Sequence, residues 1–83
     1  MMNIDTVVTL EDNNKYFLAD QVINDNIKYF LANLLDENEE MTEKSMIFKE
    51  TINEDGKSFL EEVNDQNLNN LLIAMFANSL IVH

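Results

Sequence analysis

Turn-forming residues divide the first 63 residues of this chain into short apolar runs, and this punctuation constrains the fold most strongly. The four interruptions are Glu11-Asp12-Asn13-Asn14, Asn24-Asp25-Asn26, the acidic segment 36–40 and Asn53-Glu54-Asp55-Gly56. Between them lie runs rich in β-branched and aromatic residues, which favour strands. We expect a single small domain spanning residues 1–83, because a chain of this length holds one modest core.

The apolar runs predict an antiparallel sheet. Strands are expected at 6–10, 15–23, 27–35, 46–52 and 59–63. The separator Asn24-Asp25-Asn26 suits the turn of one hairpin. Gly56, the only glycine, suits the positive φ that the tight turn of a second hairpin requires.

After residue 64 the spacing of the apolar residues changes from that of a strand to that of a helix. Apolar residues recur every three or four positions, which predicts a helix over 65–82 capped by Asn64 or Asp65. The face expected to lie on the sheet consists of Leu68, Leu71, Leu72, Met75, Phe76 and Leu80. The expected fold class is α+β: a small antiparallel β-sheet of four to five strands with two hairpins, covered by one C-terminal α-helix.

One alternative fits part of the same sequence. Residues 15–35 also carry apolar side chains at helical spacing, so this segment could be one helix of an all-α bundle. The positions in question are Tyr16, Ala19, Ile23, Ile27, Phe30 and Leu34. Residues 24–26 favour the sheet, because Asn and Asp are poor helix formers in the middle of a helix. The choice between a hairpin and a helix at 15–35 stays open on sequence alone.

Several segments follow one another in a recognisable order. They are Val8-Thr9-Leu10-Glu11-Asp12, Lys15-Tyr16-Phe17-Leu18, the strand from Ile27 to Asn33, an acidic loop, the stretch from Glu54 to Val63 and a Leu-rich helix. This order resembles the YrzB-like family of small acidic Firmicute and phage proteins. Here the first hairpin lacks the family's glycine and the helix is more apolar. The resemblance implies a fold and no known activity.

Charge is concentrated in the middle of the chain. Sixteen Asp and Glu residues against five lysines give a formal charge of −11. Residues 36–65 hold eleven of the acids and three of the lysines, whereas residues 66–83 hold none of either. Because such a surface repels a phosphate backbone, we expect no direct nucleic-acid binding.

No catalytic residue is expected. The only histidine is His83, and no serine stands in a nucleophile elbow. The adjacent carboxylates of Glu39-Glu40 and Glu61-Glu62 would face opposite sides of a strand, so they do not form a catalytic pair. The sequence therefore predicts a protein that is not an enzyme.

No metal or cofactor is expected either. Asp36, Asn38 and Glu40 have the first three spacings of a calcium loop, but Met41 and Ile47 stand where that loop requires Gly and Glu. The chain has no cysteine, which rules out thiolate ligands. The acidic segment is better explained as a charged, solvated loop.

The first function hypothesis is a non-enzymatic acidic interaction protein. Its acids would imitate spaced phosphates and occupy the basic nucleic-acid-binding surface of a host enzyme, as a phage or mobile-element inhibitor would do. Anti-CRISPR and other DNA-mimic proteins have this size and charge. Acids that only keep a small domain dissolved would explain the same composition. The residues expected at this acidic face are Asp36, Glu37, Glu39, Glu40, Glu43, Glu50, Glu54, Asp55, Glu61 and Glu62.

The alternative is a small structural or regulatory subunit that docks or dimerises through its C-terminal helix. The solvent side of this helix carries only neutral residues, and the contact would use Ile73, Ala77 and Ile81. We expect no membrane anchor, because the uncharged run 66–82 contains four asparagines and is shorter than the roughly 20 apolar residues that cross a bilayer. Without cysteine or a recognisable secretory signal, the protein is expected in the cytoplasm.

Overall fold

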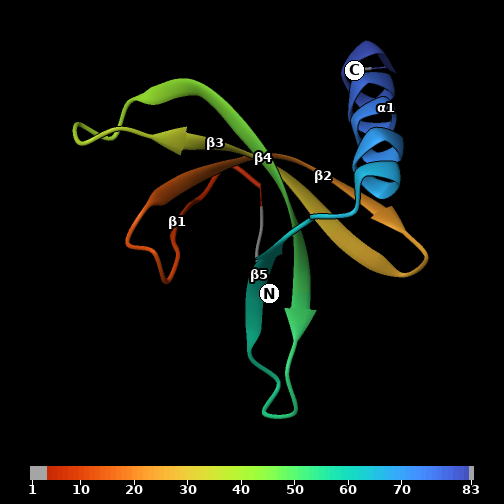
Figure 1. Cartoon of the computed structure of the whole chain (residues 1–83), viewed down its shortest axis with the longest axis horizontal. Coiled ribbons are helices and arrows are strands. Elements are labelled where there is room, and N and C mark those ends of the chain that lie inside the picture. Colours follow the sequence, from red (N-terminus) through yellow and green to blue (C-terminus); the bar gives the residue numbers. More distant parts are fainter. Residues whose placement is uncertain (1–3, 83) are drawn as a thin grey trace.

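The computed structural model describes residues 4–82, with side chains described up to residue 78. It contains one five-stranded antiparallel sheet and one helix (Figure 1). The elements are β1 (Val7–Thr9), β2 (Lys15–Asn24), β3 (Ile27–Leu35), β4 (Met41–Ile52), β5 (Ser58–Glu62) and α1 (Gln66–Val82). The strands lie in sequence order, so every connection is a hairpin and β1 and β5 form the two edges. The predicted α+β class is confirmed.

Residues 15–35 form the β2–β3 hairpin, so the all-α alternative is wrong. Asp25 and Asn26 have φ angles of 52° and 64° and form a two-residue turn between Asn24 and Ile27. A type I′ turn needs positive φ at both central positions, and Asp and Asn tolerate this conformation better than most residues. The turn formed by Asp25 and Asn26 therefore produces a hairpin here, although the apolar residues also fit the spacing of a helix.

A β-bulge in β2 sends the two halves of that strand to opposite faces of the sheet. The register with β3 shifts between Leu18 and Asp20. Tyr16 and Leu18 belong to one core cluster, whereas Val22 packs against the other, although all three positions are even-numbered. An inserted residue reverses the face of every later side chain. Simple alternation therefore does not describe the apolar residues of β2.

The other three hairpin loops share one backbone construction. They comprise residues 10–14, 36–40 and 53–57. In each, the N–H of the first residue donates to the carbonyl of the fifth, and the N–H of the fourth donates to the carbonyl of the first, at 2.9–3.0 Å. The fourth residue has positive φ, at Asn13 (66°), Glu39 (61°) and Gly56 (77°). This is a common three-residue hairpin loop, and the positive φ predicted for Gly56 is confirmed.

β4 begins at Met41, five residues before the predicted strand 46–52. The extra part pairs with β3 alone, because β5 pairs only with residues 48–52 of β4. That part of β4 is therefore an edge, and its polar residues 42–45 are of the kind that exposed edges carry. The strand predicted at 27–35 has the expected bounds, and the others differ by one residue at one or both ends.

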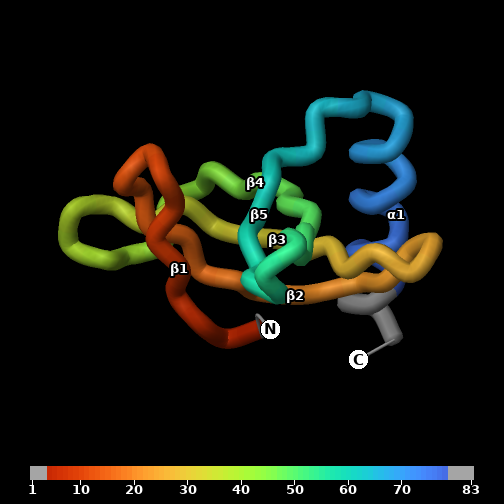
Figure 2. Tube along the Cα trace, turned by 90° about the horizontal axis from the view of Figure 1, so that it is seen from below, coloured from red at the N-terminus to blue at the C-terminus, as the bar shows by residue number. Residues whose placement is uncertain are grey.

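The sheet builds a core cluster on each face. The first cluster contains Tyr16, Leu18, Phe30, Ala32 and Phe48. The second contains Tyr29, Ile47, Leu72 and Phe76. Only the second includes residues of α1, which lies on the side of the β2–β3 turn (Figures 1 and 2). The first cluster is enclosed by the twist and curl of the sheet itself.

Asp65 begins the helix, as one of the two predicted caps. Its Oδ1 accepts hydrogen bonds from the N–H groups of Asn67 (2.9 Å) and Leu68 (3.2 Å). These bonds satisfy two of the four donors that a helix start leaves unpaired. Within residues 4–82, no helix is long and apolar enough to cross a membrane.

The apolar face of α1 is narrower than predicted. Leu72 and Phe76 are buried, and Leu68 and Met75 pack partly against the second cluster. Leu71, expected on the same face, is 49% exposed, so this assignment is wrong. Only one narrow stripe of the helix meets the sheet, and Leu71 lies beside that stripe. The predicted contact of Leu80 lies outside the described side chains.

Candidate functional site

The predicted acidic residues form two groups at opposite ends of β4. The first lies on the β3–β4 hairpin and the second on the β4–β5 hairpin (Figure 1). The first group is Asp36, Glu37, Glu39, Glu40 and Glu43, and the second is Glu50, Glu54, Asp55, Glu61 and Glu62. β4 has 12 residues, so the two hairpin loops are separated by its full length. The ten acids therefore do not form a compact patch by themselves.

Two further acids, Glu11 and Asp12, lie beside the second group, because they line a cleft together with Glu61 and Glu62. They belong to the 10–14 loop between β1 and β2, whose residues line one cleft together with β5 and another together with the 36–40 loop. The 10–14 and 36–40 loops lie on the side of the molecule away from α1 (Figures 1 and 2). We call the first group, the second group, Glu11 and Asp12 together the acidic arc.

Exposed carboxylates dominate the arc. Fourteen of the sixteen Asp and Glu side chains of the chain are exposed, and all members of the arc except the partly buried Glu50 are among them. Lysines do not border the cleft beside β5, which is lined by twelve described residues including four carboxylates. This side of the molecule therefore presents a negative field to an approaching partner.

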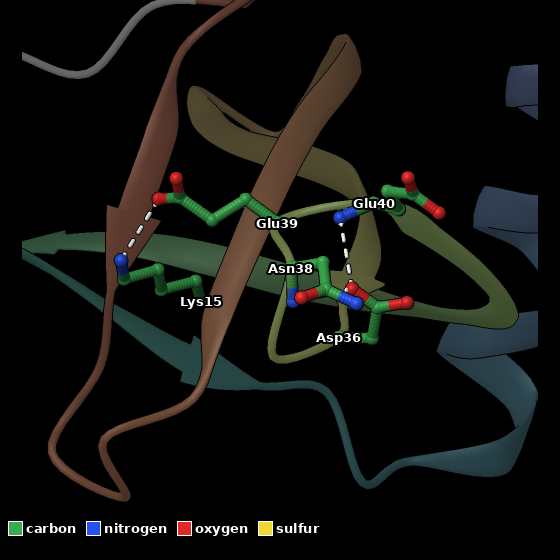
Figure 3. A network of polar contacts seen from close by, with 5 residues as sticks. All are labelled: Lys15, Asp36, Asn38, Glu39 and Glu40. Carbon is green, nitrogen blue, oxygen red and sulfur yellow. Dashed lines mark hydrogen bonds and ion pairs between the residues drawn. The ribbon is translucent and has the colours of Figure 1, made fainter.

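The 36–40 loop is stabilised by its own first residue (Figure 3). Asp36 Oδ1 accepts hydrogen bonds from the N–H groups of Asn38 (2.8 Å) and Glu40 (3.0 Å). Asp36 therefore shapes the loop, as Asn53 does in the 53–57 loop, where its Oδ1 accepts from two N–H groups at 3.0 Å. Within residues 4–82, no three Asp, Glu, His or Cys side chains are grouped so that they could hold a metal ion.

An ion pair joins this loop to β2. Lys15 Nζ lies 2.8 Å from Glu39 Oε1, and both side chains are exposed (Figure 3). The hydrogen bond from Lys15, together with its charge, lowers the pKa of the Glu39 carboxyl. The two groups flank a cleft of about 460 Å³ between the β1–β2 and β3–β4 loops. Because both side chains are exposed, the pair contributes little to stability.

The larger cleft, between the 10–14 loop and β5, has a volume of about 560 Å³ and an aromatic floor. Tyr16 and Phe48 lie there with ring centroids 5.1 Å apart in an edge-to-face arrangement. Met46, Leu60 and Phe59 add apolar surface. Four exposed acidic residues border the cleft, Glu11, Asp12, Glu61 and Glu62, and the side chains of Glu61 and Glu62 leave β5 on opposite faces.

Tyr16 links the floor of this cleft to its rim. Tyr16 is buried, with 3% of its surface exposed, and its hydroxyl donates a hydrogen bond to Asp12 Oδ2 at 3.4 Å. Burial raises the pKa of the Tyr16 hydroxyl, and the negative charge of Asp12 raises it further. The Tyr16 hydroxyl is therefore harder to ionise than that of an ordinary tyrosine, which disfavours its use as a nucleophile.

The residues predicted for a helix contact have a different setting. Ile73 is 53% exposed, and Ala77 is also exposed. The side chain of Ile81 lies outside the described residues. Leu71 adds a further exposed apolar side chain to α1. The helix thus offers a neutral, apolar surface that contrasts with the acidic arc.

No protein-family model matches the chain, and no curated protein or solved structure matches it either. The resemblance to the YrzB-like family stays a prediction. Function is therefore argued from the geometry of this chain alone.

Sequence reasoning missed Glu11, Asp12 and Tyr16 as members of the site. Glu11 and Asp12 were interpreted only as turn formers, and Tyr16 only as an apolar strand position. Their importance depends on the approach of the 10–14 loop to β5, two segments more than 40 residues apart. The only local signal was the high acid content of the turn itself.

Proposed function

We propose that the protein is a non-enzymatic acidic interaction protein that occupies the basic nucleic-acid-binding surface of an enzyme, as an inhibitor that imitates DNA. The main support is the acidic arc, in which Glu11 and Asp12 join Glu61 and Glu62 around one cleft and all members but Glu50 are exposed. A groove that binds DNA is lined by Lys and Arg that neutralise phosphates, and the arc offers the same charge to those side chains. Such an inhibitor would act in the cytoplasm of a cell that carries a phage or mobile element.

The position of the acids supports binding more than solubility alone. Solubility is served by charges of both signs spread over the surface. Here the carboxylates follow the hairpins and the rim of an aromatic-floored cleft, and α1 carries no charge. An opposite field on the partner would steer the two proteins together and would be screened by salt.

A capture experiment tests the proposal. The immobilised protein is incubated with bacterial lysate at about 50 mM and about 500 mM salt, and retained proteins are identified by mass spectrometry. We expect a nucleic-acid-binding enzyme to be retained at low salt and released at high salt. Retention that does not depend on salt, or recovery of no nucleic-acid enzyme, contradicts the proposal.

Matched variants separate the position of charge from its amount. Glu61→Gln/Glu62→Gln and Asp20→Asn/Asp25→Asn each remove two negative charges, the first from the rim of the cleft and the second from β2 and its turn. Only the first variant should lose the captured enzyme. Equal loss from both variants would mean that net charge alone drives the association.

A second candidate function is docking or homodimerisation through α1. The observation that favours it is the exposure of Leu71 (49%) and Ile73 (53%) on a helix without charged residues. An apolar contact of this kind would resist salt and would fail when Ile73 is changed to Asp. Sedimentation of the wild type and Ile73→Asp at both salt concentrations distinguishes it from charge-driven binding.

A further inference from the structure

β5 is a free edge of the sheet that borders the acid-rimmed cleft. It pairs with β4 on one side, and among the described residues 4–82 no strand pairs with its other side. The opposite edge, β1, contributes Thr9 to the same cleft, to which β5 contributes all five of its residues. The cleft therefore separates the two edges of a sheet that curls toward closure.

The hydrogen-bond pattern shows which backbone groups of β5 point outward. Val63 N–H donates to the carbonyl of Ile47 at 3.0 Å, and Asn53 N–H donates to the carbonyl of Lys57 at 2.9 Å. Hydrogen-bonded and non-hydrogen-bonded positions alternate along an antiparallel pair. Ser58, Leu60 and Glu62 lie at the alternate positions, so their N–H and C=O groups point away from β4.

The same three residues line the cleft, and Leu60 packs against the cluster that contains Tyr16 and Phe48. A strand added along this edge would bond to the outward groups and place alternate side chains over the aromatic floor. The volume of about 560 Å³ is within the range of sites that enclose part of a ligand. Both the backbone and the surface of the site therefore suit an extended chain.

Charge identifies the occupant. Glu11, Asp12, Glu61 and Glu62 border the cleft, and no lysine is among its described lining residues. A second copy of this chain would bring a charge of −11 to the contact and would be repelled. A segment that alternates Lys or Arg with apolar residues would place cations beside the rim and apolar side chains on Phe48 and Leu60.

We propose that β5 binds an extended, lysine- or arginine-rich segment of a partner protein by strand addition. This inference rests on the proposed function, because it names the part of a basic partner that the acidic arc receives. Acids on the free edge also discourage pairing with uncharged or acidic strands. The edge is thus selective for basic segments.

The test uses the purified full chain and a synthetic octapeptide of alternating lysine and valine, blocked at both ends. Titration followed by NMR measures the affinity, and amide hydrogen exchange reports on Leu60 and Glu62. Binding should slow exchange of these two outward amides. A peptide of the same sequence methylated on every backbone nitrogen keeps the charge and loses all donors, so it should bind about tenfold more weakly or worse.

A protein variant gives an independent test. Ser58→Pro removes an outward N–H at the first residue of an edge strand, where proline is tolerated, and leaves the charge unchanged. It should weaken binding of the unmethylated peptide, whereas the matched control Ser58→Ala should not.

Two results would overturn strand addition. If the methylated and unmethylated peptides bind equally and the amides of Leu60 and Glu62 exchange at unchanged rates, the carboxylates alone attract the peptide. The proposed function would then stand without this mode of binding. If neither peptide binds while the capture experiment still yields a salt-sensitive enzyme, β5 is not the receiving edge. Failure of the capture experiment itself removes the proposed function.

Discussion

The two faces of the sheet are completed in different ways. On one face α1 covers the cluster of Tyr29 and Ile47, and Leu72 of the helix is fully buried there. On the other face the sheet curls over Tyr16 and Phe48, but a cleft of about 560 Å³ stays open between the 10–14 loop and β5. The helix is uncharged and leaves a smaller cleft of about 210 Å³ between itself and β4, whereas the larger cleft of the curled side is bordered by acids.

We therefore assign stability mainly to the face that α1 covers, and propose binding for the face that stays open. A helix that contributes its own side chains can seal a sheet face without leaving an edge. A sheet that curls without joining its two edge strands leaves backbone donors and acceptors available at those edges. The same five strands therefore supply a core that α1 covers and, at β5, an edge that α1 does not complete.

The largest expected effect compares one leucine from each side. Leu72→Ala removes a fully buried side chain and should lower the free energy of unfolding by about 2–5 kcal/mol. Leu60→Ala, at the partly exposed edge of the open side, should lower it by about 1 kcal/mol. Urea unfolding of both variants measures the difference. Equal losses would mean that the curled side is as closely packed as the helix side.

The sequence predicted the parts of this comparison that local chemistry determines. The β2–β3 turn followed from Asp25 and Asn26, which accept positive φ, and the helix followed from its period and from Asp65. Neither needs information from a distant part of the chain. These elements were accordingly placed within a residue or two.

The sequence did not predict what depends on distant segments. The first residues of β4 are polar and pair with β3 but not with β5, so no apolar pattern marks them as a strand. The bulge after Leu18 moves the later side chains of β2 to the other face of the sheet, so simple alternation fails there. Leu71 fits the helical period but lies outside the stripe that meets the sheet. The acidic arc required the approach of the 10–14 loop to β5, which no local pattern encodes.

An intermediate effect is expected in the hairpin loops of the acidic side. Gly56→Ala places a side chain at a φ of 77°, which should destabilise the fold by about 1–2 kcal/mol. No atom lies within 4 Å of the added Cβ, so the cost comes from the backbone conformation. Thermal unfolding measures it, and an unchanged melting temperature would show that the loop relaxes without cost.

The equivalent position of the other acidic loop should respond in the opposite direction. Glu39→Gly relieves a φ of 61° in a residue with a Cβ and should stabilise the fold by up to about 1 kcal/mol. The substitution also removes the ion pair with Lys15, which is exposed and contributes little to stability. The same unfolding measurement applies, and a clear loss of stability would mean that the ion pair outweighs the relief of strain.

The smallest effect concerns the pH dependence of the open side. The folded protein raises the pKa of Tyr16 above the ordinary value near 10, so the folded state holds this proton more tightly than the unfolded state does. The resulting contribution to stability is fully present below pH about 10 and is lost as the pH rises through the folded pKa. Tyr16→Phe should remove this part of the alkaline decline, measured by urea unfolding between pH 8 and 11. An identical decline in the variant would exclude Tyr16 as its source.

The central claim is that the acidic side binds in place of nucleic acid, and a competition assay tests it most directly. A fluorescent DNA duplex is bound to the enzyme recovered by capture, and fluorescence anisotropy follows the addition of this protein. The wild type and the Asp20→Asn/Asp25→Asn variant should displace the duplex, and the Glu61→Gln/Glu62→Gln variant should displace it poorly. Formation of a ternary complex in which the duplex and the protein are bound together would contradict the account.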